Sequence, residues 1–325
     1  MAFLDPLKNS RQGDWIVVDV IEFNNVWDAV DRIVDKLPFV SGELRSLVDE
    51  RIGIKKLEIK ASSPDPVYAV DSAFPSSPLD LVGMSMSIIA VAVVMYSHGK
   101  TNVKRSRKML VEFLGELDQD YVTALARIEE RRHALSVVDN AEMLVIDGEI
   151  LPRRGRSDLW PNVEQLSIML VKEATRKDIP LVGVLKRSYS RHIANIINVP
   201  LSDKAIASLV LRRGEYIEVK HNQEQLAKLG CKIAFYKPLR GLAEAVKLEI
   251  CSRAVSVEDV VAVLAREAGP TGLPWLIDLV DSIVKKEVAH INAVHGLLLA
   301  RLARARRHSL VYYTNPQEKS RTKLL

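Results

Sequence analysis

Short runs of apolar, often β-branched residues alternate along the chain with stretches whose apolar positions recur at helical spacing. The short runs predict buried strands, and they lie at 67–74, 81–96, 141–151, 179–186 and 231–238. AVKLEI at 245–250 alternates apolar and charged residues, which predicts a strand with one exposed face. The polar, basic stretch 98–108 predicts a loop.

Helical spacing of apolar positions predicts the remaining elements. The predicted helices lie at 109–138, 162–177, 203–211, 256–267 and 275–308, and 24–60 is also helical in pattern. SSPDP at 62–66 marks a boundary, because such residues interrupt regular structure. The mixture of elements predicts an α/β layered domain. The predicted parts are an N-terminal helical segment at 1–62, a main domain at 63–310 and a basic tail at 311–325.

Composition narrows the class of protein. The 325 residues are 48% hydrophobic and 27% charged, which is ordinary for a soluble globular chain. A net charge of +5 permits binding to a polyanion without proving it. The apolar run 81–96 is too short and interrupted for a membrane span, and the N-terminus lacks a signal-peptide core. Cys231 and Cys251 lack metal-site spacing, so we expect two packed thiols in a reduced, cytoplasmic protein.

Two predicted strands end in aspartate, Asp71 and Asp147. Open sheets bind ligands beyond the carboxyl ends of their strands. Neighbouring carboxylates repel one another unless a cation lies between them. Oxygen ligands suit magnesium or manganese, and two such ions can hydrolyse a phosphodiester without a protein nucleophile. The alternative is that each aspartate merely caps backbone N–H groups in a turn.

The motifs around these aspartates resemble the NurA family of nucleases. VYAVDSAF at 67–74 is similar to the family's first motif, and MLVIDGEIL at 143–151 is similar to its second. Glu130, in IEERRHALSVV, occupies the place of the family's helical glutamate, and GLPWLIDLVD at 272–281 resembles its C-terminal pattern. Glu129 lies about 100° away from Glu130 on a helix, so only one faces the site, and the spacing favours Glu130.

The resemblance, which runs from about residue 65 to residue 300, implies an RNase H-like mixed sheet flanked by helices, with a long C-terminal helix. It implies hydrolysis of single- and double-stranded DNA by 5′-to-3′ exonuclease and single-strand endonuclease action. The implied partners are the HerA hexameric ATPase, in DNA end resection and double-strand break repair, and a second copy of the chain. The implied ligands of two manganese ions, with magnesium as the alternative, are Asp71, Glu130, Asp147 and Asp281.

Four further residues are predicted to contact DNA. By resemblance, Lys186 at the end of strand 179–186 reaches the scissile phosphate as a point charge; a solvated lysine is the alternative. Tyr236, Lys237 and Arg240 would line a channel for a single strand, with the tyrosine stacked on a base and the two cations on phosphate. The alternative is a packed tyrosine with charged residues at the rim.

The chain departs from the family pattern in three places. Ser72-Ala73 replaces Gly-Ser, Leu273 stands where tyrosine is common, and Asp281 stands where some members have histidine. These departures motivate a second hypothesis, a DNA-binding adaptor subunit of a HerA complex with a degraded site. A third is an RNase H-like enzyme that acts on RNA or an RNA–DNA hybrid, because carboxylates do not distinguish sugars whereas contacts to the 2′-hydroxyl do.

Overall fold

The structure is a computed structural model. It describes residues 42–58, 63–81, 84–113, 117–221, 223–241 and 244–304. Contacts divide the chain into two compact units, Met1–Leu44 and Arg45–Leu325, and the second unit contains every strand of the sheet. Most of the predicted N-terminal helical segment, and the whole predicted basic tail, lie outside the described residues.

The core of the second unit is a ten-stranded sheet with the order β1-β8-β9-β10-β7-β6-β2-β4-β3, in which β5 also pairs with β4. β2, β6 and β7 are parallel, and the other paired strands are antiparallel. The five strands β5-β4-β2-β6-β7 have the chain order 3-2-1-4-5, so the predicted RNase H-like arrangement is confirmed. The strands are β1 (Lys55–Lys56), β2 (Val67–Ala73), β3 (Leu79–Leu81), β4 (Met84–Ser97), β5 (Lys100–Phe113), β6 (Met143–Asp147), β7 (Leu181–Leu185), β8 (Glu215–Lys220), β9 (Lys232–Tyr236) and β10 (Val246–Cys251).

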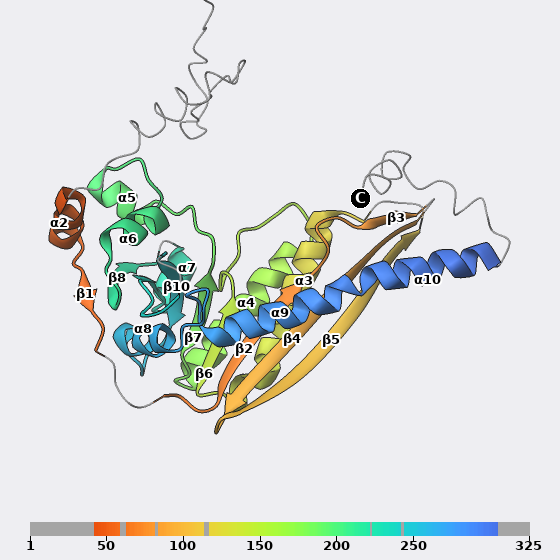
Figure 1. Cartoon of the computed structure of the whole chain (residues 1–325), viewed down its shortest axis with the longest axis horizontal. Coiled ribbons are helices and arrows are strands. Elements are labelled where there is room, and N and C mark those ends of the chain that lie inside the picture. Colours follow the sequence, from red (N-terminus) through yellow and green to blue (C-terminus); the bar gives the residue numbers. More distant parts are fainter. Residues whose placement is uncertain are drawn as a thin grey trace, which may run out of the picture. The chain divides into compact units, whose positions relative to one another are not determined.

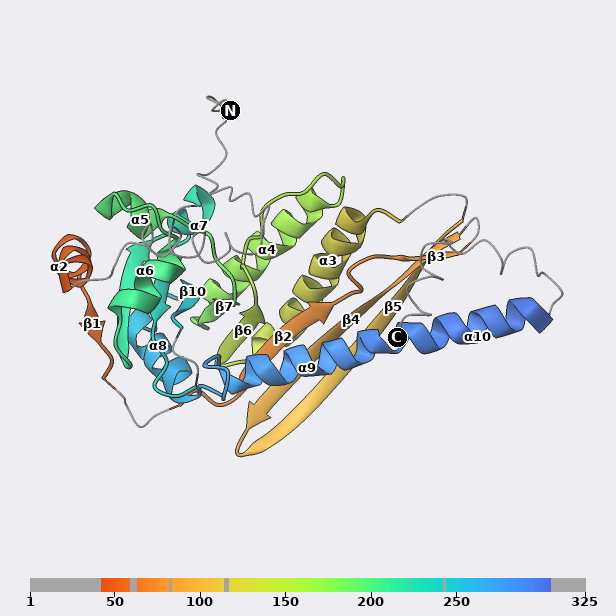
Figure 2. The ribbon, with the colours of Figure 1, turned by 45° about the horizontal axis from the view of Figure 1, so that its top comes forward.

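Helices cover both faces of this sheet (Figures 1 and 2). α3 and α4 pack side by side on one face, and α9 crosses β2 and β4 on the other. The helices are α2 (Gly42–Arg51), α3 (Gln119–Val137), α4 (Trp160–Arg176), α5 (His192–Ile197), α6 (Asp203–Val210), α7 (Glu224–Lys228), α8 (Val257–Arg266), α9 (Trp275–Ala289) and α10 (Ile291–Arg304), with a 3₁₀ turn η1 (Val138–Asn140).

Alternating side chains on the central strands separate two cores. Val70 and its neighbours on one face pack against α3 and α4. Ala69, Ala90 and Ala92 on the other face pack against α9. Because successive strand residues point to opposite faces, the small alanines form one continuous surface, on which the apolar stripe of α9 lies.

Two predicted elements at the start of this domain are wrong. Residues 100–108 of this stretch belong to β5, which forms a hairpin with β4 along the full length of both strands, and only His98 and Gly99 form the turn between them. Its side chains are mostly exposed because helices cover little of either face of this edge strand, and its polar composition is therefore similar to that of a loop. The helix predicted at 109–138 therefore begins only at Gln119, where the Asp118 side chain accepts a hydrogen bond from the Asp120 N–H.

Two later predictions also need correction. The strand predicted at 245–250 to be half exposed is β10, whose side chains are all buried, including Lys247 and Glu249. β10 lies between β7 and β9, so neither edge is free. The single helix predicted at 275–308 is two helices, α9 and α10, which are divided at His290.

Cys231 and Cys251 form a disulfide, so the prediction of two free thiols is wrong. The register explains the pairing: Ile250 lies opposite Lys232, which places the next residue of each strand pair, Cys251 and Cys231, face to face with 4.1 Å between their Cα atoms. None of the helices within the described ranges has the length and apolar content that a membrane span requires.

Candidate metal centre

Asp71 and Asp147 lie side by side at the carboxyl ends of β2 and β6. These two strands are parallel, and their register pairs Ala69 with Val145 and Val70 with Ile146. Continuing that register places Asp71 next to Asp147, and both side chains lie on the face that α9 covers. The parallel register therefore brings together two carboxylates that are far apart in sequence.

Asp281 reaches the same point from α9. One carboxylate oxygen from each of Asp71, Asp147 and Asp281 lies within 4.8 Å of the others. The three side chains line a cleft of about 450 Å³. Two strand ends and one helix thus bring oxygen ligands together from widely separated parts of the sequence.

Two glycines shape the turn beyond Asp147. Gly148 has a φ of 119°, which side-chain-bearing residues rarely adopt. Gly183, on β7, lies under this turn, and a Cβ atom there would lie 2.6 Å from the Gly148 carbonyl oxygen. The turn can cross β7 closely only because Gly183 has no side chain.

Lysines neutralise part of the carboxylate charge. The Lys186 ammonium lies 2.5 Å from Asp147 Oδ2 and 2.9 Å from Asp281 Oδ1. Lys285, one turn after Asp281 on α9, lies 2.7 Å from the other oxygen of that carboxylate. Lys186 therefore bridges two of the three clustered aspartates.

Glu130 approaches from α3, on the other side of the strand ends. It is fully buried, whereas Glu129 points away to Lys108 and Arg132. Glu130 Oε2 accepts hydrogen bonds from Ser72 Oγ at 2.6 Å and from Arg127 at 2.8 Å. Its other oxygen forms an ion pair with Arg131, which is also fully buried.

Three donors therefore hold the Glu130 carboxylate, and Ser72 joins it to the backbone next to Asp71. The resemblance places Glu130 among the metal ligands. In the structure it lies outside the cluster of three aspartates and contacts Ser72, the residue next to Asp71. Sequence reasoning misses Arg127 and Arg131, although Arg127 has the i, i+3 spacing from Glu130 that favours an ion pair on a helix.

Crowding of the acids shifts their proton affinities. Burial, together with the Asp147 and Glu130 carboxylates, raises the pKa of Asp71 to about 8. Burial also raises the pKa of Asp147, although Lys186 opposes this rise. Burial disfavours the charged form of Asp281 as well and acts to raise its pKa. Hydrogen bonds from Lys285 and Lys186 outweigh this effect and lower the pKa below the ordinary value.

These residues fit a hard divalent cation. The donors are carboxylate oxygens, which magnesium and manganese prefer. The raised pKa of Asp71 means that the cluster holds a proton near neutral pH unless positive charge replaces it. A cation on the three aspartates would supply that charge, with displacement of Lys186 from its bridging position.

The other predicted DNA contacts lie along the same sheet edge, but they are not equivalent. The register from β7 through β10 to β9 brings the end of β9 to the edge at which Lys186 lies. Arg240 is exposed, and the half-buried Lys237 donates a hydrogen bond to the Ser208 carbonyl at 2.8 Å. Tyr236 is fully buried in the core. The stacking role expected of Tyr236 is corrected accordingly, since its ring offers no face to a base.

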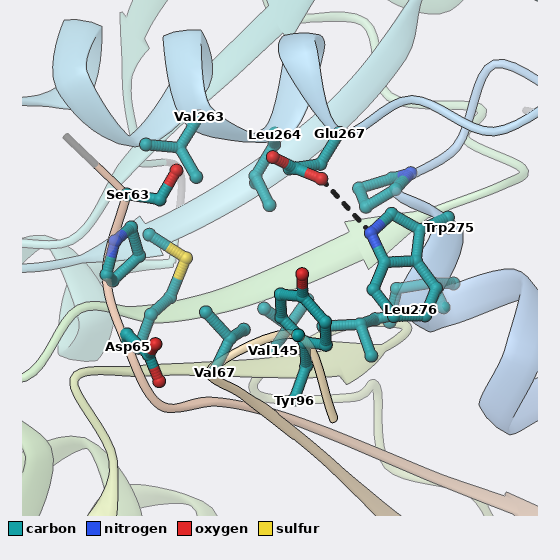
Figure 3. A pocket seen from close by; sticks show the side chains of 15 residues that line it. Ser63, Asp65, Val67, Tyr96, Val145, Val263, Leu264, Glu267, Trp275 and Leu276 are labelled. Atoms are coloured by element: carbon teal, nitrogen blue, oxygen red, sulfur yellow. Dashed lines mark hydrogen bonds between the residues drawn. The ribbon is translucent and has the colours of Figure 1, made fainter. Parts of the chain in front are cut away.

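A second cavity, of about 230 Å³, lies at the opposite edge of the sheet. Its wall is mostly apolar and includes Val67, at the start of β2, and Val145 (Figure 3). Tyr96 and Trp275 meet edge to face with 5.1 Å between their ring centroids, and the Trp275 indole N–H donates to Glu267 at 3.1 Å. This cavity has no cluster of metal-ligating groups among the described residues.

Comparison with known proteins identifies one matching protein family. A family model described as the NurA domain matches residues 65–285. No curated protein sequence matches significantly.

Solved structures with the same fold include the NurA nuclease from Sulfolobus solfataricus, with a TM-score of 0.65 and 12% identity over 90% of this chain and 100% of that one. A structure of NurA with manganese matches with a TM-score of 0.52 and 12% identity over 86% of this chain and 98% of the other. A structure of NurA bound to dAMP and manganese matches with a TM-score of 0.50 and 12% identity, over 81% and 93% respectively. At such low identity these matches show a shared fold.

Proposed function

Because this chain belongs to the NurA family, we propose that it is a metal-dependent DNA nuclease whose catalytic centre is the cluster of Asp71, Asp147 and Asp281. The observation that carries the proposal is the meeting of three carboxylate oxygens within 4.8 Å at the carboxyl ends of parallel strands. Related NurA structures hold manganese, and one holds dAMP as well.

The proposed cofactor is manganese, with magnesium as the alternative. Asp71, Asp147 and Asp281 would hold it, and Glu130 would join them as a ligand of a second ion by exchanging its contact with Arg127. When bound, such ions polarise the phosphodiester and generate a nucleophile from water at neutral pH. The protein supplies the rigid placement of the carboxylates, since two stand on paired strands and the third on a packed helix.

The cations of the site have a separate proposed role. With a metal on the aspartates, Lys186 would be released from Asp147 and Asp281 toward the substrate phosphate. Its tether at the end of β7 keeps the ammonium close to the cleft, which Lys186 lines together with Arg127 and Arg187. These positive side chains favour a phosphodiester over a neutral substrate.

The direct test is cleavage of labelled linear single- and double-stranded DNA with manganese. Asp147→Asn is expected to reduce the rate about 1,000-fold or more, because metal catalysis contributes several kcal/mol and each 1.4 kcal/mol is tenfold. The matched control is Asp139→Asn, which changes an exposed aspartate that pairs with Lys177 away from the cluster. Equal rates for Asp147→Asn and the parent would overturn the proposed site.

The same assay distinguishes the nuclease from two other possible functions. An adaptor subunit with a degraded site would bind DNA without producing shortened products. An enzyme that acts on RNA or an RNA–DNA hybrid would cut those substrates faster than DNA in competition. The presence of three clustered aspartates, despite the Ser72 and Leu273 departures, favours the nuclease over the adaptor.

The finer expectations rest on the family. We propose 5′-to-3′ exonuclease and single-strand endonuclease action, a homodimer, a cytoplasmic location, and work with the HerA ATPase in DNA end resection and break repair. End-labelled substrates test the polarity, and light scattering tests the dimer. We propose that the N-terminal segment 1–62 docks on HerA. Co-purification with HerA, with and without residues 1–20, tests this role, and unchanged complex formation would count against that segment.

A further inference from the structure

Beside the carboxylate cleft lies a smaller cavity of about 190 Å³. Its wall comes from the segment after β6, the loop after β7, and β10. Glu149 and Arg187 line both this cavity and the carboxylate cleft, so the two spaces adjoin. The lining residues are Glu149, Arg153, Arg187, Ser188, Tyr189, Ser190, Gln223, Lys247 and Glu249.

Lys247 is a buried cation in this wall. Only 4% of the residue is exposed, and β10 places it directly opposite Leu185, next to Lys186. Its nearest carboxylate among the described residues is Glu249, 3.6 Å away, which is beyond ordinary hydrogen-bond range. A buried ammonium with three N–H donors is costly unless acceptors satisfy it, so this side chain has donors to offer to a ligand in the cavity.

Glu249 forms an ion pair with Lys247, but its carboxylate has other partners as well. Its Oε2 accepts a hydrogen bond from the Ile150 N–H at 2.9 Å, and its Oε1 lies 3.8 Å from His221 Nε2. Burial acts to raise the pKa of Glu249, but His221 and Lys247 lower it below the ordinary value. The carboxylate thus serves the turn after β6, and an anion could approach Lys247 from the cavity.

The rim of the cavity adds two cations and an aromatic ring. Arg153 and Arg187 are exposed, and neither forms an ion pair or a side-chain hydrogen bond with another described residue. Tyr189 is 87% exposed, the largest fraction among the exposed apolar and aromatic residues of the described chain. An exposed tyrosine beside unpaired arginines is the combination that binds single-stranded nucleic acid, by stacking on bases and by contact with phosphates.

We propose that this cavity is a nucleotide subsite for single-stranded DNA, in which Lys247 and the two arginines hold a phosphate and Tyr189 stacks on the base beside it. The inference rests on the proposed nuclease function, because it assigns the strand that the adjoining carboxylates would cut. The volume suits a phosphate group with a few waters, since each water occupies about 30 Å³. Stacking requires an unpaired base, so the subsite selects single strands.

The test measures binding separately from cleavage. Fluorescence anisotropy follows a labelled oligothymidylate with calcium in place of manganese, and a gel checks that the strand stays intact. Tyr189→Leu is expected to weaken binding about tenfold, within the range for loss of one stacked base, whereas Tyr189→Phe retains parental affinity. Tyr121→Leu is the matched control, because Tyr121 is a partly exposed tyrosine on α3 outside this cavity.

An abasic strand of the same length separates stacking from a structural role. On that strand Tyr189→Leu should bind as well as the parent, because no base remains to stack. Arg187→Gln should weaken binding to both strands and lower the salt slope by about 0.7, the value for one phosphate contact on a single strand. Arg154→Gln, which alters an arginine already paired with Glu164, should leave the slope unchanged.

Lys247→Met tests the buried cation, with its circular dichroism and melting temperature as the check on folding. It should lower the salt slope as Arg187→Gln does; if it fails to fold, the rim variants decide. An equal penalty for Tyr189→Leu on normal and abasic strands, unchanged binding by Tyr189→Leu and Arg187→Gln, or no binding by the parent would each overturn the subsite. Binding with these penalties but no cleavage with manganese would overturn the proposed nuclease and leave the subsite standing.

Discussion

The two ends of β2 lie in contrasting surroundings. Val67, at its start, lines a mostly apolar cavity, in which the Trp275 indole N–H donates a hydrogen bond to Glu267 (Figure 3). Asp71, near its end, lies against two other carboxylates and has a pKa raised to about 8. β2 therefore connects an apolar edge of the sheet, where burial stabilises the fold, to a charged edge, where repulsion between carboxylates destabilises the fold.

This contrast indicates where the protein carries its function. Burying apolar surface stabilises a fold without any particular ligand. Buried like charges destabilise a fold unless cations accompany them. Here the carboxylates are held by Lys186, Lys285 and the pair of arginines around Glu130, so the charged edge is a balanced set that a metal can rearrange.

Loss of a buried cation at the charged edge should have the largest effect on stability. Arg131→Met leaves the fully buried Glu130 without its ion-pair partner, so we expect a loss of about 3–5 kcal/mol in the free energy of unfolding, measured in urea. Arg132→Met is the neighbouring control: that arginine is exposed and pairs with Glu129, and its loss should cost less than about 1 kcal/mol. An equal loss in the free energy of unfolding for both variants would contradict the claim that Arg131 stabilises the buried Glu130 carboxylate.

Removal of the disulfide should weaken the apolar edge without touching the charged one. Cys251 lies opposite Leu181, at the start of β7 and far along the sheet from the cluster. Replacing both cysteines by alanine should lower the free energy of unfolding by about 3 kcal/mol, while the cleavage rate of the folded protein remains parental. A selective loss of cleavage with unchanged unfolding would show that the two edges are not separable.

The pH dependence of Asp71 should give a smaller effect of opposite sign. Its pKa is 3.8 in an unfolded reference and about 8 in the fold. Between these values the unfolded chain has released the proton while the native state still holds it, so the free energy of unfolding falls as pH rises. In metal-free buffer the gain in stability of Asp71→Asn over the parent should therefore grow by at least about 2 kcal/mol between pH 5 and pH 8. A constant difference across this window would mean that Asp71 ionises normally.

Much of the contrast follows from local patterns in the sequence. β2 and β6 are predictable because each is a short apolar run, and the aspartate that ends each run marks the polar edge. The resemblance of four motifs to one family then indicates which acids belong together. The RNase H-like order and the match over residues 65–285 confirm the fold and the family.

Other features depend on pairing that no local pattern reveals. Lys247 and Glu249 alternate with apolar residues, as on an exposed strand face, but the turn that crosses Gly183 and donates to Glu249 covers them. Tyr236 ends β9 and Tyr189 follows β7, and only the tertiary fold buries the first and exposes the second. Residues 100–108 of β5 resemble a loop in sequence because an edge strand can be polar on both faces.

The central claim is that Asp71, Asp147 and Asp281 form one divalent-cation site, and manganese binding measured by calorimetry tests it most directly. Two variants on α9 make a matched pair. Asp281→Asn removes a carboxylate from the cluster, whereas Asp278→Asn changes an aspartate on the same helix that accepts a hydrogen bond from Thr271. We predict that Asp281→Asn binds manganese at least about tenfold more weakly than the parent, as loss of a ligand requires, while Asp278→Asn binds as the parent does. Parental affinity in Asp281→Asn would contradict the site.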